Sequence, residues 1–217
     1  MAKIEKFYEF NKVSDTLHAF DFDDTLFETP KWEDVAKKFI FENNAVKDLV
    51  DIALSEIGNN KSKLKTQDGR IFLEDPLNVF SETKNWVRKG ARLYLVQPDK
   101  FTYLDESLPT GLKNISKIYK EVENKCIITA RPESMRDKIE TVLKNSGLEY
   151  PKFGLWMCPD GRVRAGVWKG EKICEISKKF KFNEVIFYDD NSKYLRDSKR
   201  VVSEKMPQLI FKTVKVF

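Results

Sequence analysis

Two aspartates stand two residues apart directly after a short apolar run, in the segment Leu17-His18-Ala19-Phe20-Asp21-Phe22-Asp23. Alternate side chains of an extended strand point to the same side, so Asp21 and Asp23 can face one pocket just past the end of a buried strand. Burying two carboxylates without a partner is costly in free energy. A divalent cation together with a phosphoryl group would give this pair a use.

Two other interpretations of the aspartate pair were weighed. A calcium loop needs further acidic residues at alternate positions and a closing glutamate, but Leu26 and Phe27 follow here instead. An acidic strand end without any chemistry remains the plain alternative, and only the rest of the chain can argue against it.

The chain alternates short apolar runs with stripes of apolar residues at helical spacing. Strands are predicted at 16–21, 126–129, 153–157, 185–188 and 209–214. Helices are predicted from three apolar stripes: Leu112, Ile115, Ile118 and Tyr119; Met135, Ile139, Val142 and Leu143, with Gly147 as the stop; and Ile173, Ile176 and Phe180. This alternation predicts an α/β fold with a parallel sheet, in which ligands bind beyond the carboxyl ends of the strands. The polar residues at those ends are Asp21, Thr129, Asp189 and Asp190.

The segment between the first two predicted core strands is too long for an ordinary crossover. It contains a helical pattern that begins near Trp32, a polar stretch from Gly58 to Gly69, and then mixed helix and strand patterns. We therefore expect a core domain formed by residues 1–26 and 110–217, and an inserted cap at 27–109 that covers the site and selects substrates.

Composition limits the class of protein. A hydrophobic content of 41% in 217 residues indicates a folded globular chain, and no apolar run approaches the roughly 18 residues of a membrane span. The three cysteines show no paired spacing, so we expect reduced thiols and a cytoplasmic location. The single histidine, His18, lies inside a predicted strand, which argues for a structural role and against triad or histidine–zinc chemistry.

Basic residues are concentrated in the last third of the chain. From Pro151 to Phe217 there are 15 Lys and Arg against 8 Asp and Glu, whereas the whole chain has a net charge of +5. This bias suggests a polyanionic substrate. The alternative is that lysines such as Lys178, Lys179 and Lys181 only solvate a helix end.

Four short motifs in order resemble the haloacid dehalogenase superfamily. They are Asp21-Phe-Asp23-Asp-Thr25, Thr129 at the end of Cys-Ile-Ile-Thr, Lys169 in Gly-Val-Trp-Lys-Gly, and the pair Asp189-Asp190 after an apolar strand. The resemblance covers residues 16–26 and 110–217. It implies a Rossmann-like three-layer core with a parallel sheet, and a cap inserted between the first and second core strands.

The resemblance also implies a role for each matched residue. Asp21 would attack phosphorus and form an aspartyl-phosphate, and Asp23 would act as general acid and base. Thr129 and Lys169 would bind the phosphoryl oxygens. Mg²⁺ would be held by Asp21, by the backbone carbonyl of Asp23 and by Asp190. Asp189 would orient a metal-bound water, and Asp190 is favoured over it as the direct ligand.

Some assignments stay open at this point. Lys172, one turn from Lys169, competes for the lysine role, and Arg131 could bind a phosphate or pair near the helix that follows Pro132. Arg162 and Arg164 could contact a second phosphate or form a charged hairpin around Asp160-Gly161. The tryptophans could stack on bases, although packing is their commoner use: Trp32, Trp86, Trp156 and Trp168.

The segment Phe-Asp-Phe-Asp-Asp-Thr-Leu-Phe-Glu-Thr-Pro, with Thr-Ala-Arg-Pro and Tyr-Asp-Asp further on, also resembles the domain of this superfamily found in Swiss-army-knife RNA repair proteins and related phage proteins. That resemblance implies a phosphate-monoester substrate at a polynucleotide end, or a nucleotide. The group tends to carry a basic residue where this chain has Asn191. The alternatives are a phosphatase for a small metabolite, a phosphomutase, and a binding protein that keeps the fold without turnover.

Overall fold

The computed structural model describes residues 15–30, 35, 44–56, 64–67, 70–74, 86–89, 92–95, 108–109, 111–159 and 164–217. The chain divides into two compact units, one formed by Met1–Glu28 with Gly111–Phe217 and the other by Thr29–Thr110. The sequence predicts the core domain at residues 1–26 and 110–217 and the insertion at residues 27–109.

The first unit contains a five-stranded sheet in which every neighbouring pair is parallel. Its strands lie in the order β11-β10-β1-β8-β9. They are β1 (Thr16–Phe20), β8 (Lys125–Pro132), β9 (Leu155–Cys158), β10 (Glu184–Asp189) and β11 (Ile210–Lys215). The predicted α/β class with a parallel sheet is confirmed.

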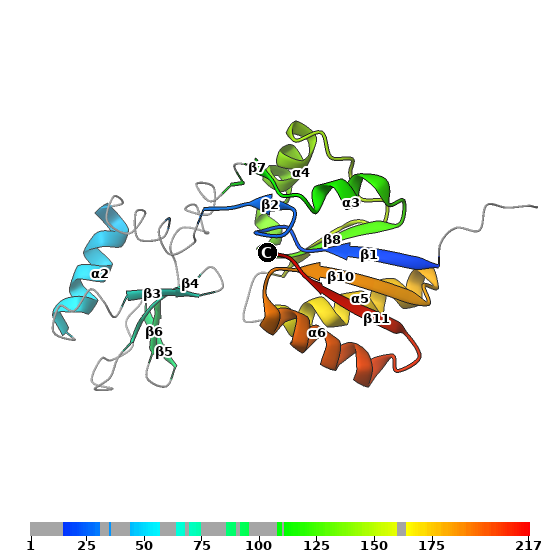
Figure 1. Ribbon diagram of the computed structural model, residues 1–217. Coiled ribbons are helices and arrows are strands. Elements are labelled where there is room, and N and C mark those ends of the chain that lie inside the picture. Colours follow the sequence, from blue (N-terminus) through cyan, green and yellow to red (C-terminus); the bar gives the residue numbers. More distant parts are fainter. Residues whose placement is uncertain are drawn as a thin grey trace, which may run out of the picture. The chain divides into compact units, whose positions relative to one another are not determined.

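Helices cover both faces of this sheet (Figure 1). They are α3 (Ser116–Glu121) and α4 (Arg136–Asn145), preceded by the 3-10 turn η3 (Glu133–Met135), on one face, and α5 (Ala165–Phe180) and α6 (Ser192–Lys205) on the other. The arrangement is a three-layer, Rossmann-like core.

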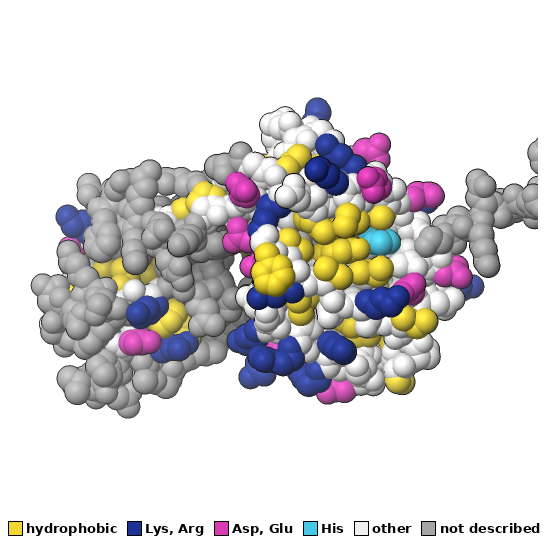
Figure 2. Space-filling view, in the orientation of Figure 1, with side chains coloured by type: hydrophobic (Ala, Val, Ile, Leu, Met, Phe, Trp, Pro, Cys, Tyr) yellow, Lys and Arg dark blue, Asp and Glu magenta, His cyan; other side chains and the backbone are white. Residues whose placement is uncertain are grey.

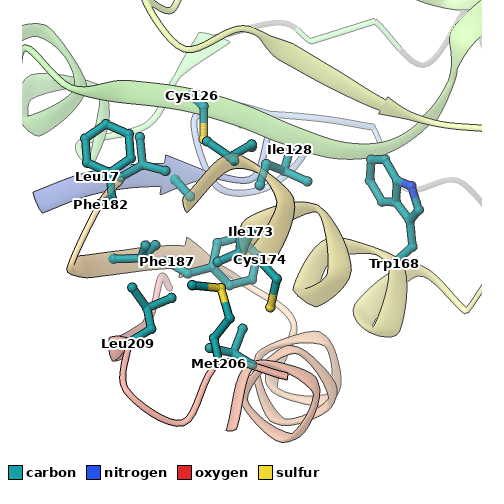
Figure 3. Close-up of a cluster of buried hydrophobic side chains, with 14 of the residues drawn as sticks. Leu17, Cys126, Ile128, Trp168, Ile173, Cys174, Phe182, Phe187, Met206 and Leu209 are labelled. Atoms are coloured by element: carbon teal, nitrogen blue, oxygen red, sulfur yellow. The ribbon is translucent and has the colours of Figure 1, made fainter. Parts of the chain in front are cut away.

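The main hydrophobic cluster lies between the sheet and α5 (Figure 3). Leu17 of β1, Phe187 of β10 and Ile173 of α5 belong to this cluster, and all three are fully buried. Helices α5 and α6 pack closely because α5 carries glycine at the contact: a Cβ on Gly170 would lie 2.9 Å from the Cα of Ser198. This packing fixes α5, and with it the residues of its first turns, against the sheet.

The backbone gives a reason for the changed bounds of two predicted elements. Leu112 is not part of a helix: with Gly111 it forms β7 (Gly111–Leu112), which pairs antiparallel with β2 (Phe27–Glu28), and α3 begins four residues after Leu112. Strand β9 begins at Leu155 rather than at Phe153, because Gly154 has a positive φ of 92° and its N–H bonds to the carbonyl of Pro151 in a turn. In both places a backbone pairing overrides the apolar pattern.

The second unit contains a helix and an antiparallel sheet in the order β3-β4-β6-β5. The elements are α2 (Asn44–Glu56), β3 (Leu64–Gln67), β4 (Arg70–Glu74), β5 (Trp86–Lys89) and β6 (Arg92–Leu95). Val50 and Leu54, one turn apart on α2, are buried, as are Ile71 and Leu93 in the sheet. Of the helical pattern predicted from Trp32, the second part falls in α2, whereas Trp32, Phe39 and Ile40 lie outside the described residues.

His18 and the cysteines occupy structural positions. His18 Nδ1 lies 3.1 Å from the hydroxyl oxygen of Tyr188 on the neighbouring strand, and burial lowers the pKa of this histidine although Glu184 opposes the shift. Cys126, Cys158 and Cys174 are buried and form no disulfide. None of the helices in the described part of the chain has the length and apolar character needed to cross a membrane.

Candidate active site

Three carboxylates from two adjacent strands meet at the carboxyl edge of the parallel sheet. Asp21 directly follows β1, Asp189 is the last residue of β10, and Asp190 comes next. Carboxylate oxygens of the three lie within 4.8 Å of one another. The group can therefore hold a metal ion, and its all-oxygen donor set suits a hard cation.

Lys169 is the cation that touches this cluster. Its Nζ lies 2.7 Å from Oδ1 of Asp21 and 2.7 Å from Oδ2 of Asp189, and its side chain is fully buried. Burial disfavours a charged amine, but the charges of Asp189 and Asp21 outweigh burial and raise the pKa of Lys169. The structure brings Lys169 to the carboxylates, whereas Lys172 pairs with the exposed Glu175. Lys169 lies in the second turn of α5, which begins at Ala165.

The acidic cluster carries more negative charge than Lys169 balances. Burial raises the pKa of Asp21 well above its usual range, with the nearby charges of Asp189 and Asp23 adding to the effect and Lys169 opposing it. Burial and then the charge of Asp189 raise the pKa of Asp190 to about 6. Both carboxyl groups thus lie where an added cation would favour their ionised form.

Backbone and hydroxyl groups lock the loops that carry these carboxylates. The N–H of Asn191 donates to Oδ1 of Asp189 at 2.7 Å, so both oxygens of Asp189 have a partner. Thr25, fully buried, accepts the N–H of Asp190 at 3.0 Å and ties the loop after β1 to the loop after β10. Nothing in the local sequence pattern shows which strand the Thr25 hydroxyl will meet, so this role of Thr25 could not be expected from the sequence.

Asp23 faces a different partner from Asp21. The guanidinium of Arg131 donates hydrogen bonds to both carboxylate oxygens of Asp23. Its Nε lies 3.0 Å from Oδ1 and 2.9 Å from Oδ2, and its Nη2 lies 2.6 Å from Oδ1. Arg131 is fully buried, whereas the side chain of Asp23 is 18% exposed. Arg131 thus forms an ion pair with Asp23, and a contact of Arg131 with a phosphate stays a prediction. The carboxylate of Asp23 is not among the three that gather for a cation, and the metal role predicted for its backbone carbonyl stays a prediction.

Thr129 lies at an irregularity in β8. The register against β9 shifts between Thr129 and Pro132, and the hydroxyl oxygen of Thr129 accepts the N–H of Arg131 at 3.1 Å. The hydroxyl proton of Thr129 therefore points elsewhere and can be donated to a ligand.

The remaining predicted residues lie elsewhere or serve packing. Arg164 is exposed at the start of α5, and Arg162 with the predicted hairpin lies outside the described residues. Trp168 is buried in the main cluster, and Trp156 donates its Nε1–H to the carbonyl of Phe153 at 2.8 Å. Asn191 caps α6: its side-chain oxygen accepts the N–H groups of the next helical residues. The usual N-cap preference could have found that role from the sequence.

Comparison of the chain with protein-family models, with curated proteins and with solved structures finds no match. The resemblance to the haloacid dehalogenase superfamily stays a prediction, and the functional assignment rests on the geometry of the site.

Proposed function

We propose that the protein is a magnesium-dependent phosphohydrolase in which Asp21 is the nucleophile. The observation that carries this proposal is the buried contact of Lys169 with both Asp21 and Asp189, within a group of three carboxylates that a cation can bridge. A carboxylate held by an ammonium group beside a cation site is the arrangement that attack on an anionic phosphoryl group requires.

Charge supports the choice of a divalent cation. Among the described residues, Lys169 supplies the one ammonium group that pairs with Asp21 and Asp189, so ionisation of these two and of Asp190 leaves two negative charges to be balanced at a largely buried site. Carboxylate ligands fit Mg²⁺, which would neutralise charge on the phosphoryl oxygens when bound. Asp189 already uses both oxygens within the protein, so Asp190 is the better direct ligand.

The chain supplies the groups for both halves of the reaction. The Asp21 carboxylate attacks phosphorus as the bond from phosphorus to the leaving oxygen breaks, and Asp23, which enters this step in its protonated form, donates its proton to that oxygen. In the second half Asp23 takes a proton from water, which attacks phosphorus and releases Asp21 and inorganic phosphate. Lys169 and the hydroxyl of Thr129 bind phosphoryl oxygens throughout, and Arg131 keeps Asp23 in place.

The second unit is assigned the role of a substrate-selecting cap. It is inserted between β2 and β7, and this antiparallel pair brings the two ends of the insertion together within the first unit. Phe27 of β2 forms a bridge with Asp23, and Lys113, next to β7, donates to the carbonyl oxygen of Asp24 at 2.9 Å. The insertion thus leaves and re-enters the core within a few residues of the proposed general acid.

Phosphate release from p-nitrophenyl phosphate and from a panel of nucleotides tests this proposal. We expect release that depends on Mg²⁺, is lost in Asp21→Asn and persists in Asp24→Asn, because Asp24 is exposed and its left-handed φ of 51° accepts asparagine. Acid-quenched protein should carry phosphate on Asp21. Release that survives Asp21→Asn, or the absence of release from every substrate, would refute the assignment.

A further inference from the structure

The exposed side of α6 carries a strip of positive charge. Lys193, Arg196, Lys199 and Arg200 are all exposed on this helix, and Lys215 is exposed at the end of the neighbouring strand β11. Figure 2 shows Lys and Arg side chains gathered over α6 and the end of β11. Lys193, Arg196 and Arg200 have the spacing that places side chains along one side of a helix, over about 10 Å. We call Lys193, Arg196, Lys199, Arg200 and Lys215 the basic strip.

The basic strip begins at the candidate active site. Helix α6 starts directly after Asn191, so Lys193 lies in the turn next to the catalytic carboxylates. Lys215 pairs in register with Asp189, and the N–H of Val216 donates to the carbonyl oxygen of Asp189 at 3.1 Å. From there the strip follows α6 away from the sheet edge.

Most of these charges are not used inside the protein. Other lysines of the same region form ion pairs: Lys205 with Glu171, and Lys212 with Glu184. Across the described residues Lys193, Arg196 and Lys199 have no carboxylate partner of this kind, and Arg200 pairs only with the exposed Glu204. Unpaired cations on one face attract a polyanion and raise its local concentration.

An aromatic ring stands at the end of the strip nearest the site. Phe217 is 91% exposed, and Nζ of Lys215 lies 4.8 Å from its ring centroid. An exposed phenylalanine ring is poorly solvated by water. Its flat face can stack on a base, and the neighbouring Lys215 can contact the adjacent phosphate.

We propose that the basic strip binds the sugar-phosphate backbone of a single-stranded nucleic acid whose terminal phosphate enters the active site. This inference rests on the proposed function for the hydrolysis of that phosphate, but the binding of the strand can be measured independently. A nucleic acid presents a terminal monoester and a regularly charged backbone in one molecule, which matches a phosphoryl site continuous with a line of cations. Phe217 then stacks on a base near the end of the strand.

The test compares two variants that remove equal charge. The strip variant carries Lys193→Gln, Arg196→Gln and Lys199→Gln. The control carries Lys178→Gln, Lys179→Gln and Lys181→Gln, which are equally exposed and lie at the opposite end of α5 from Lys169. Binding is measured by fluorescence anisotropy with a single-stranded oligonucleotide of about 12 nucleotides that has hydroxyl ends, so that no turnover occurs.

We expect the strip variant to bind the oligonucleotide at least tenfold more weakly in low salt. The slope of log affinity against log salt should fall in magnitude by about 2, since each lost contact with a single-stranded phosphate removes about 0.7. The control should bind as the native protein does. With a 3′- or 5′-phosphorylated oligonucleotide, kcat/KM relative to that for p-nitrophenyl phosphate should fall in the strip variant alone.

Each outcome separates the two proposals. Equal losses in the strip variant and the control, or binding to anionic phosphatidylserine vesicles but not to the oligonucleotide, would overturn the nucleic-acid assignment. Weaker oligonucleotide binding in the strip variant, without phosphate release from any substrate, would uphold the strip and refute the phosphohydrolase. Circular dichroism and thermal unfolding of both variants establish that each is folded.

Discussion

Replacing Lys169 by methionine tests the electrostatic centre of the site. Methionine keeps the length of the side chain and removes its charge. Lys169 makes two contacts of 2.7 Å with buried carboxylates, and removing one partner of a buried ion pair costs about 3–5 kcal/mol. We expect Lys169→Met to lower the free energy of unfolding by that amount at pH 7.5 in EDTA, where no cation can take the place of the ammonium group.

The cost of this substitution should depend on pH. Without Lys169 the pKa of Asp21, already raised by burial, rises further above its unfolded value, so the folded variant binds more protons than the unfolded one. Each proton that the folded variant binds in excess of the native protein reduces its deficit by about 1.4 kcal/mol per pH unit as the pH falls. The deficit of Lys169→Met relative to the native protein should therefore shrink by up to about 2.7 kcal/mol between pH 7.5 and pH 5.5.

Urea unfolding at the two pH values measures both effects, with Lys172→Met as the matched control. Lys172 lies one turn away on the same helix and pairs with the exposed Glu175, so its loss should cost less than about 1 kcal/mol at either pH. This expectation is refuted if Lys169→Met and Lys172→Met unfold with the same free energy, or if the deficit of Lys169→Met does not change with pH. In either case the contacts of Lys169 with the buried carboxylates do not stabilise the fold by the expected amount.

Three other changes give separate tests. Gly170→Ala should destabilise the protein by about 1–2 kcal/mol in urea unfolding, despite the better helix propensity of alanine, because the new Cβ would lie 2.9 Å from the backbone of Ser198; a gain in stability would contradict this. Arg131→Lys loses the fork that holds Asp23 and should lower kcat about 100-fold while leaving Mg²⁺ affinity unchanged; equal kcat values would contradict a positioning role. Burial lowers the pKa of His18, so the folded state binds fewer protons below about pH 6.5 and its stability is lost as pH falls. His18→Gln should lose less free energy of unfolding than the native protein between pH 7.5 and 5.5, and equal losses would show that His18 contributes nothing to the pH dependence.

Local patterns predicted the strands well because their causes are local. The apolar runs that end in Asp21 and Asp189 are buried strands, and parallel strands place their carboxyl ends at one edge of the sheet. That rule was enough to expect these aspartates near one another. The helix predicted from apolar spacing was wrong at Leu112. The partner strand β2 lies more than eighty residues earlier in the chain, so the local spacing of apolar residues does not reveal it.

The amino-acid sequence by itself determined the α/β class and the acidic strand ends, since side-chain periodicity and turn residues act within a few positions of the chain. Tertiary structure decided which cation serves which carboxylate. The resemblance selected Lys169 among 39 Lys and Arg but left Lys172 as a competitor, and only the packing of α5 on the sheet brings Lys169 to Asp21 and Asp189. Arg131 reaches Asp23 across 108 positions of the chain. Such pairings depend on distances between elements, which are set by the packing of the whole core.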